Sequence, residues 1–215
     1  MKTVVFDMDG VLFDSERLCQ DSWLAVAKES GLPGMEEIFP RCIGLNANDS
    51  RQVVLDAYGQ DFDYEGFRQR ASVWFWEFIE KNGLPVKTGV RELLNWLRDH
   101  KWTVGLASST RRSSVEKCLE SAGITEYFQE IITGDMVEHS KPLPDIYLLA
   151  CRKLGKKPEE SYAIEDSPNG IRSAHAAGMH PLMVPDMIAP DEEMRNLSER
   201  VFENLYEIIG YFSGV

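Results

Sequence analysis

Two aspartates near the start of the chain, Asp7 and Asp9, are the first residues whose type and spacing could do chemistry. They follow the apolar residues 4–6 and precede Gly10, a pattern typical of a buried strand that ends in a loop. Two carboxylates this close in a dry pocket need a cation, or one of them must keep its proton. The pattern therefore predicts a divalent-metal site, acid–base catalysis, or both. The alternative for so short a motif is a solvated loop in which Asp9 and Asp14 begin the next helix.

Three further strand-like runs end in polar side chains that could complete the same chemistry. Ser108 ends one run, Lys141 follows the next at a short distance, and the acidic pair 165–166 ends a third. Each has an ordinary explanation when taken alone, because hydroxyls and carboxylates often begin helices and most lysines are solvated. In an open parallel sheet, however, ligands bind beyond the carboxyl ends of the strands. Since these side chains follow strand ends in chain order, we expect them to meet in one site.

The spacing of the apolar residues predicts an α/β fold with a Rossmann-like parallel sheet. A first strand is expected over residues 2–9, and later strands alternate with helices, which implies right-handed crossovers and helices on both faces of the sheet. Ser113 and Glu116 have the spacing of a capping box, and Ser167 is a predicted N-cap. The later strands are expected at residues 102–107, 131–134, 162–164 and 181–184, and the helices between and after them begin at residues 88, 113, 145, 168 and 204.

The stretch between the first strand and this alternating part has helical patterns without a convincing strand. Glycine and proline interrupt it at the joints, so that helices are expected over residues 15–30, 48–58 and 64–81. The sequence therefore predicts a core domain made of residues 1–14 and 87–215. A helical domain of residues 15–86, within the size of a small sub-domain, is inserted directly after the carboxylate loop.

The composition limits the partners and the compartment. A formal net charge of −12 over 215 residues argues against a nucleic-acid surface. It does not exclude an anionic substrate, because a metal ion and one lysine can reverse the field locally. We expect a cytoplasmic protein that is a monomer or a weak dimer, with no signal peptide, no membrane-spanning run and reduced thiols. The four cysteines are widely spaced, at Cys19, Cys42, Cys118 and Cys151.

Residues 7–12, with the sequence Asp-Met-Asp-Gly-Val-Leu, resemble the first motif of the haloacid dehalogenase (HAD) superfamily of aspartate-nucleophile phosphatases. The resemblance is to the branch that includes phosphatases of small sugar phosphates and β-phosphoglucomutase. Ser108, Lys141 and the acidic pair 165–166 match the other three motifs in order. The resemblance implies an HAD-like α/β core. It also implies that the inserted helices form a mobile α-helical cap domain that covers the phosphate site and selects the leaving group.

The charges of the carboxylates suggest a role for each in phosphoryl transfer, and the resemblance implies the same roles. Asp7 is the predicted nucleophile, because carboxylates can accept a phosphoryl group as an aspartyl-phosphate. Asp9 is expected to protonate the leaving oxygen and then to activate water. Mg²⁺ prefers hard oxygen ligands, and we expect Asp7, the backbone carbonyl of Asp9 and Asp166 to bind it. Glu165 is expected to be a direct or an indirect partner of the same ion.

Other polar residues are candidates for holding the substrate. Lys141 and Ser108 are expected to bind the phosphoryl oxygens, as electrostatic stabilisation of phosphoryl transfer requires, with Ser109 and Asn169 as further candidates. The inserted helices carry candidates for contact with the leaving group, although helix packing or solvation is the more common role for any one of them. These are Asn46, Asn48, Arg70, Trp74 and Trp76.

We therefore expect a Mg²⁺-dependent HAD-like phosphomonoester hydrolase that acts on small phosphorylated metabolites, with sugar phosphates foremost. One alternative is a hexose-phosphate mutase. The mutases that this chain resembles have a histidine where Cys19 stands, and an arginine for the second phosphate where Ala47 stands. Arg41 and Arg51 flank that loop and could compensate. The other alternative is a non-enzymatic, receiver-like phospho-accepting module, against which the insertion and Asp9 argue, because a receiver requires a slowly hydrolysed aspartyl-phosphate.

Overall fold

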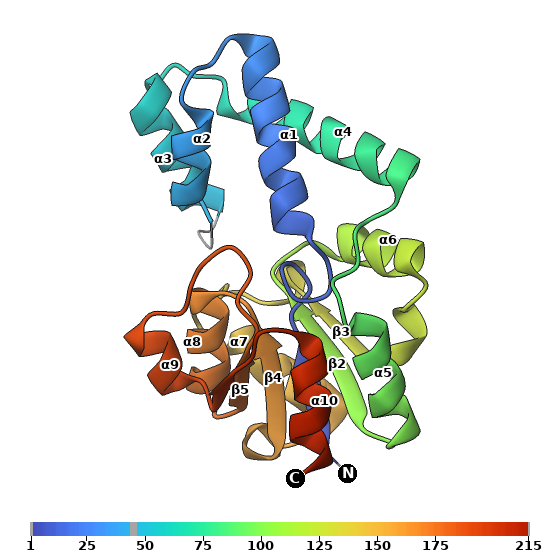
Figure 1. The fold of residues 1–215 in the computed structure, drawn as a ribbon. Helices are drawn as coiled ribbons and strands as arrows, with labels where there is room; N and C mark the ends of the chain where they lie inside the picture. The colour runs from blue at the N-terminus through green and yellow to red at the C-terminus, as the bar shows by residue number, and fades with distance from the viewer. Residues whose placement is uncertain (1, 44–46, 215) are drawn as a thin grey trace. The chain divides into compact units, whose positions relative to one another are not determined.

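The chain divides into two compact units in the computed structural model, which describes residues 2–43 and 47–214. One unit combines Met1–Asp14 with Pro85–Val215 and contains a six-stranded sheet, whereas Ser15–Leu84 forms a helical unit. Figure 1 shows the elements of each unit along the chain. Among the described residues, no helix is both long enough and apolar enough to cross a membrane.

The helical unit ends at Leu84, two residues earlier than the expected end at residue 86. Residues 85–87 belong to the α/β unit because they pair with the end of the loop that follows the first strand. Val86 forms an antiparallel bridge with Phe13, and the backbone N–H of Asp14 donates to the carbonyl of Pro85 at 3.0 Å. These bonds close the sheet-bearing unit around the point where the helical unit is inserted.

The sheet of the α/β unit is parallel throughout, and its strands lie in the order β3-β2-β1-β4-β5-β6. The register places Phe6, the last residue of β1, opposite Leu106 of β2 and Ile164 of β4. The carboxyl ends of the three central strands therefore lie side by side, and the predicted Rossmann-like α/β fold is confirmed. The strands are β1 (Thr3–Phe6), β2 (Thr103–Ser108), β3 (Glu130–Thr133), β4 (Ser161–Glu165), β5 (His180–Met183) and β6 (Arg200–Val201).

Helices cover both faces of this sheet (Figure 1). The alternation of side chains along the strands sends Val5, Ala107 and Ala163 to one face, where they pack in a buried cluster with α7 (Asp145–Leu154) and α8 (Pro168–Ala176). The opposite face carries Tyr162, whose ring centroid lies 5.1 Å from that of Phe212 in α10 (Leu205–Ser213). Burial of both faces explains why the strands read as short continuous apolar runs. The remaining α-helices among the described residues of this unit are α5 (Val90–Asp99), α6 (Arg112–Ala122) and α9 (Glu192–Leu197). Its 3-10 turns are η2 (Thr125–Tyr127), η3 (Gly134–Met136) and η4 (Pro158–Glu160).

The helix starts in this unit show which local signals determine the structure. Ser167 is the N-cap of α8, as predicted, and its hydroxyl accepts a hydrogen bond from the N–H of Gly170 at 3.1 Å. The predicted capping box at Ser113 and Glu116 is wrong, because α6 begins one residue earlier with Arg111 as its N-cap. Glu116 instead accepts a hydrogen bond from Arg112 across one turn of the helix, at 2.7 Å.

The helical unit packs around one tryptophan, and no strand occurs among its described residues. Trp23 of α1 makes edge-on contacts with Phe39, Tyr64 and Phe67, at centroid distances between 5.2 and 6.4 Å. Asp63 caps the long fourth helix by accepting from the N–H of Gly66. The helices of the unit are α1 (Ser15–Ser30), α2 (Met35–Ile38), α3 (Ala47–Tyr58) and α4 (Tyr64–Asn82), with a 3-10 turn η1 at Phe39–Arg41.

Candidate active site

The loop after β1 turns Asp7 and Asp9 in different directions. Asp7 continues the line of the strand, because its N–H donates to the carbonyl of Ile164 at 2.9 Å. The chain then turns at Gly10, which has a φ of +77° and lies against the carboxylate of Asp166. A Cβ atom at this position would overlap that carboxylate. Glycine is therefore required here for two reasons, and the loop brings Asp7 and Asp166 close together.

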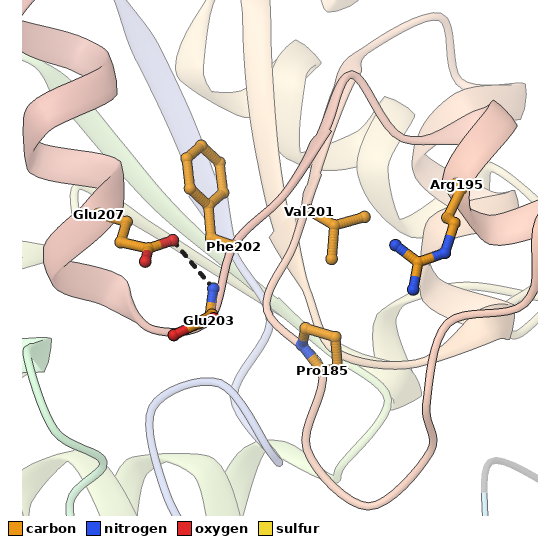
Figure 2. A pocket seen from close by; sticks show the side chains of 6 residues that line it. All are labelled: Pro185, Arg195, Val201, Phe202, Glu203 and Glu207. Atoms are coloured by element: carbon orange, nitrogen blue, oxygen red, sulfur yellow. Dashed lines mark hydrogen bonds between the residues drawn. The ribbon is translucent and has the colours of Figure 1, made fainter.

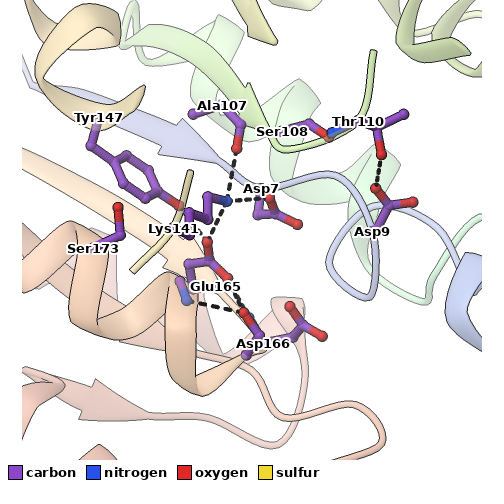
Figure 3. Close-up of polar contacts among 12 residues, drawn as sticks. Asp7, Asp9, Ala107, Ser108, Thr110, Lys141, Tyr147, Glu165, Asp166 and Ser173 are labelled. Atoms are coloured by element: carbon purple, nitrogen blue, oxygen red, sulfur yellow. Dashed lines mark hydrogen bonds and ion pairs between the residues drawn. The ribbon is translucent and has the colours of Figure 1, made fainter. Parts of the chain in front are cut away.

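Lys141 reaches this edge of the sheet from the loop before α7 and lies between two carboxylates (Figure 3). Its Nζ donates to Asp7 Oδ1 at 2.5 Å, to Glu165 Oε1 at 2.6 Å and to the carbonyl of Ala107 at 3.0 Å. An ammonium group has three hydrogens, so each of them has an acceptor. Only 7% of the side chain is exposed, which makes the two ion pairs buried ones.

Glu165 ends β4 and is completely buried. Its Oε1 also accepts a hydrogen bond from the hydroxyl of Tyr147 in α7, at 2.7 Å. The first turn of α8 can approach this carboxylate because residue 170 is a glycine, since a Cβ atom there would overlap the Glu165 side chain. Glu165 is thus held between two helices, and sequence reasoning alone did not identify Tyr147 or Gly170 as part of the site.

Burial and charge control the protonation of this cluster. Burial raises the pKa of Asp7 well above its usual range, and the negative charges of Glu165 and Asp9 add to this, while Lys141 opposes it. Burial alone would lower the pKa of Lys141, but Asp7 and Glu165 outweigh that effect and hold the pKa above its ordinary value. The two carboxylates thus favour the charged form of Lys141.

Three buried carboxylates converge at one point of the cluster. One oxygen from each of Asp7, Glu165 and Asp166 lies within 4.8 Å of the other two. Set against the single positive charge of Lys141, this group has an excess of negative charge away from water, which is costly without a cation. Hard carboxylate oxygens at this separation suit a divalent ion such as Mg²⁺ or Ca²⁺. The residues present therefore fit a metal, and they form an acidic cluster that could hold one.

Asp9 has a different environment, at the end of the neighbouring strand β2. The hydroxyl of Thr110 donates to Asp9 Oδ2 at 2.9 Å (Figure 3). Thr110 is itself held by its N–H, which donates to the hydroxyl of the fully buried Ser108 at 3.1 Å. The two aspartates that stand two residues apart are thus bound to different partners, one to a lysine and one to a threonine. Thr110 was not among the predicted site residues.

The other two predicted phosphate-binding residues, Ser109 and Asn169, follow the ends of β2 and β4. Ser109 is exposed in the loop after β2, and Asn169 is half-buried in the first turn of α8, where its side-chain oxygen accepts from Arg172 at 3.3 Å.

An open pocket lies past the ends of β5 and β6 and involves none of the carboxylate cluster (Figure 2). Its lining residues are Pro185, Arg195, Val201, Phe202, Glu203 and Glu207.

Three of the candidates in the helical unit contact other residues of the same unit. Arg70 donates to the hydroxyl of Ser30 at 2.8 Å and pairs with Glu29 at 3.1 Å, so it is bound within the unit. Trp74 stacks on Phe78 and Trp76 meets Phe75 edge-on, which agrees with the helix-packing alternative for the tryptophans. Asn48 is exposed at the start of α3. Asn46 lies outside the described residues, and the side chain of Ala47 is also not described.

With this geometry in view, comparison with known proteins identifies the family. Residues 1–178 match the family model of the haloacid dehalogenase-like hydrolases. The chain belongs to this family, and the predicted resemblance is confirmed. It is an enzyme of the hydrolase class, as the sequence predicted.

Individual relatives share most of their length with this chain. It is 32% identical over 183 residues to the phosphorylated carbohydrates phosphatase of Thermotoga maritima, which covers 83% of this chain and 82% of that protein. It is 29% identical over 216 residues to the β-phosphoglucomutase of Bacillus subtilis, covering 96% and 95% of the two chains. A solved structure of an HAD family hydrolase from Deinococcus radiodurans R1, with bound phosphate and sodium, is 28% identical. It has a TM-score of 0.81 over 100% of this chain and 96% of that chain.

Proposed function

We propose that this protein is a Mg²⁺-dependent phosphatase that hydrolyses small phosphorylated metabolites, sugar phosphates foremost, through an aspartyl-phosphate on Asp7. The observation that carries the proposal is the separation of two neighbouring aspartates. Asp7 lies in a buried cluster beside Lys141, whereas Asp9 is held apart by Thr110. A nucleophile and an acid–base residue need such different environments, because one must attack phosphorus while the other carries a proton. The 32% identity to the phosphorylated carbohydrates phosphatase of Thermotoga maritima supports sugar phosphates as the substrate class.

The reaction consists of two displacements at phosphorus. In the first, a carboxylate oxygen of Asp7 attacks the phosphorus atom, and the bond from phosphorus to the leaving oxygen breaks. Asp9 gives its proton to that oxygen, so the alcohol leaves neutral. In the second, a water molecule attacks the same phosphorus atom while Asp9 takes its proton. The bond between phosphorus and the Asp7 oxygen breaks, so that phosphate leaves and the carboxylate of Asp7 is restored.

The other residues of the cluster stabilise charge and hold the substrate. Lys141 and the hydroxyl of Ser108 are the proposed partners of the phosphoryl oxygens, with Lys141 exchanging one of its three protein acceptors for a phosphoryl oxygen. Asp7 and Asp166, with the backbone carbonyl of Asp9, are the proposed Mg²⁺ ligands. The ion would supply positive charge to the phosphoryl oxygens. The helical unit, inserted in the chain directly after this loop, is proposed to select the leaving group.

A sugar-phosphate mutase is the competing function, because a β-phosphoglucomutase is among the relatives. A mutase must hold a sugar bisphosphate, and bidentate arginine is the favoured partner for a second phosphate dianion. This chain has Ala47, the first residue of α3, where the mutases that it resembles have an arginine. Hydrolysis is therefore the proposed outcome of the second displacement.

The test is to supply β-glucose 1-phosphate with a trace of glucose 1,6-bisphosphate, alongside a panel of other phosphate esters. We expect slow release of inorganic phosphate from β-glucose 1-phosphate, faster release from at least one member of the panel, and little glucose 6-phosphate. An Asp7→Asn preparation serves as the control for contaminating phosphatases. Rapid conversion to glucose 6-phosphate with almost no inorganic phosphate would make the protein a mutase. No phosphate release from any ester would refute the proposed function.

A further inference from the structure

The carboxylate of Glu165 is surrounded by hydrogen-bond donors of the protein (Figure 3). Oε1 accepts from Lys141 at 2.6 Å and from the Tyr147 hydroxyl at 2.7 Å. Oε2 accepts from the N–H of Asp166 at 3.2 Å and from the hydroxyl of Ser167 at 3.3 Å. An ionised carboxylate has about four acceptor positions, so these four donors use them all. A metal ion could bind Glu165 directly only by displacing one of them.

Tyr147 is the donor whose presence packing does not explain. Its side chain is fully buried in α7 among apolar side chains that include Ile146 and Ala150. Phenylalanine would fill the same space without burying a hydroxyl that needs a partner. The hydroxyl points at Glu165, and the face of its ring lies 5.1 Å from Nζ of Lys141. One side chain therefore contacts both the carboxylate and the cation that it holds.

We propose that Tyr147 is a positioning residue. Its hydroxyl completes the set of four donors around Glu165. The carboxylate of Glu165 then serves to hold Lys141, and Asp7 and Asp166 are the carboxylates that bind the metal. Because Nζ of Lys141 also bonds Asp7 Oδ1, a movement of Glu165 would shift the ammonium group relative to the proposed nucleophile. For its effect on catalysis, this proposal rests on the phosphatase activity proposed above.

The kinetic test compares Tyr147→Phe with Tyr127→Phe. The first variant keeps the ring and loses the bond to Glu165. The second loses the hydroxyl of a half-buried tyrosine in the same unit, which donates to the neutral Asn95 Oδ1 at 2.7 Å. Tyr147→Phe should lower kcat about tenfold, as expected for losing one hydrogen bond to a charged group, with KM changed less than about threefold. Tyr127→Phe should keep the wild-type kcat. A wild-type kcat in Tyr147→Phe would overturn the proposal.

A double-variant cycle tests whether Tyr147 acts through Glu165. In a Glu165→Gln background, adding Tyr147→Phe should cost less than about a further twofold in kcat, because the two variants remove the same interaction. The Mg²⁺ dissociation constant, measured by calorimetry, should stay within about twofold of the wild-type value in Tyr147→Phe and in Glu165→Gln. A repeated tenfold loss in the Gln background, or Mg²⁺ binding weakened about tenfold in either single variant, would overturn the proposal.

A readout that needs no activity is the ammonium signal of Lys141 in ¹H–¹⁵N spectra that detect slowly exchanging lysine side chains. The wild-type protein should give such a signal, and Lys141→Arg should remove it, which provides the assignment. Tyr147→Phe and Glu165→Gln should each weaken or shift the signal, and Tyr127→Phe should leave it unchanged. If the wild type hydrolyses no ester, the proposed function fails but this spectrum still tests Tyr147. A Lys141 signal that is identical in Tyr147→Phe and the wild type would then refute the positioning role. Should Tyr147→Phe not fold, an unchanged signal in Glu165→Gln would refute it equally.

Discussion

Replacing Lys141 with methionine should destabilise the protein as well as inactivate it. Methionine has a similar length but no charge, so the buried carboxylates of Asp7 and Glu165 lose the cation that lies 2.5 and 2.6 Å from them. Removing one partner of a buried ion pair costs about 3–5 kcal/mol. For a chain of this size, about 1 kcal/mol lowers the melting temperature by roughly 2–4 °C, so we expect a fall of about 10 °C.

The assay is thermal unfolding followed by circular dichroism, in buffer with EDTA so that no bound metal masks the effect. Lys157→Met is the matched control, because Lys157 is 3.6 Å from Glu160 with both side chains about two-thirds exposed. That variant should change the free energy of unfolding by no more than about 0.5 kcal/mol. Phosphate release by Lys141→Met should fall at least about a hundredfold, since a donor to the reacting oxygens is lost. A wild-type melting temperature in Lys141→Met would refute the reasoning about the buried pair.

Three further predictions concern the acid–base residue, the metal and a surface histidine. Thr110→Val should lower kcat about tenfold because Asp9 loses its hydroxyl donor, while Thr110→Ser should keep most of the activity; equal rates in the two variants would contradict this. EDTA should abolish phosphate release and Mg²⁺ should restore it, with Ca²⁺ a poor substitute. Asp166→Asn should raise the half-saturating Mg²⁺ concentration at least about tenfold. Undiminished turnover in the presence of EDTA would contradict the proposed metal dependence. The hydrogen bond from His139 to Asp145 holds the pKa of that histidine above its ordinary value, so Asp145→Asn should lower it in an NMR titration. The pair stabilises the fold at pH values below the ordinary histidine pKa, and this contribution is lost as the pH rises through the raised value; a histidine pKa unchanged by the substitution would contradict the assignment.

The parts of the fold that follow from local signals could be predicted from the sequence. The strands at residues 3–6 and 161–165 read as short β-branched or apolar runs closed by acidic residues, and Ser167 met its expected role as an N-cap. Parallel strand ends must lie on one edge of the sheet, so the topology brings Asp7 and Glu165 together at the ends of the paired strands β1 and β4. Lys141 joins them from the loop before α7. The catalytic roles assigned to these residues stay predictions until they are tested.

Other features depend on tertiary contacts that leave no periodic signal. Tyr147 stands on the apolar face of α7, where an aromatic residue reads as core, and only the fold brings its hydroxyl to Glu165, 18 residues further along the chain. Thr110 similarly reaches Asp9 across 101 residues. The capping box at Ser113 failed because the chain leaves β2 with Arg111 already in the N-cap position. The short elements α9 and β6 were not predicted, since six and two residues give too little periodicity.

The most direct test of the account is to trap the phosphorylated form of Asp7. The protein is mixed with the best substrate from the ester panel, quenched rapidly in acid and reduced with borohydride, which converts an aspartyl-phosphate into homoserine. Peptide mass spectrometry then locates the modified residue. We predict homoserine at position 7 only in samples that received substrate, and unmodified aspartate at position 9. Sustained turnover with intact aspartate at position 7, or homoserine at another position, would contradict the assignment of Asp7 as the nucleophile.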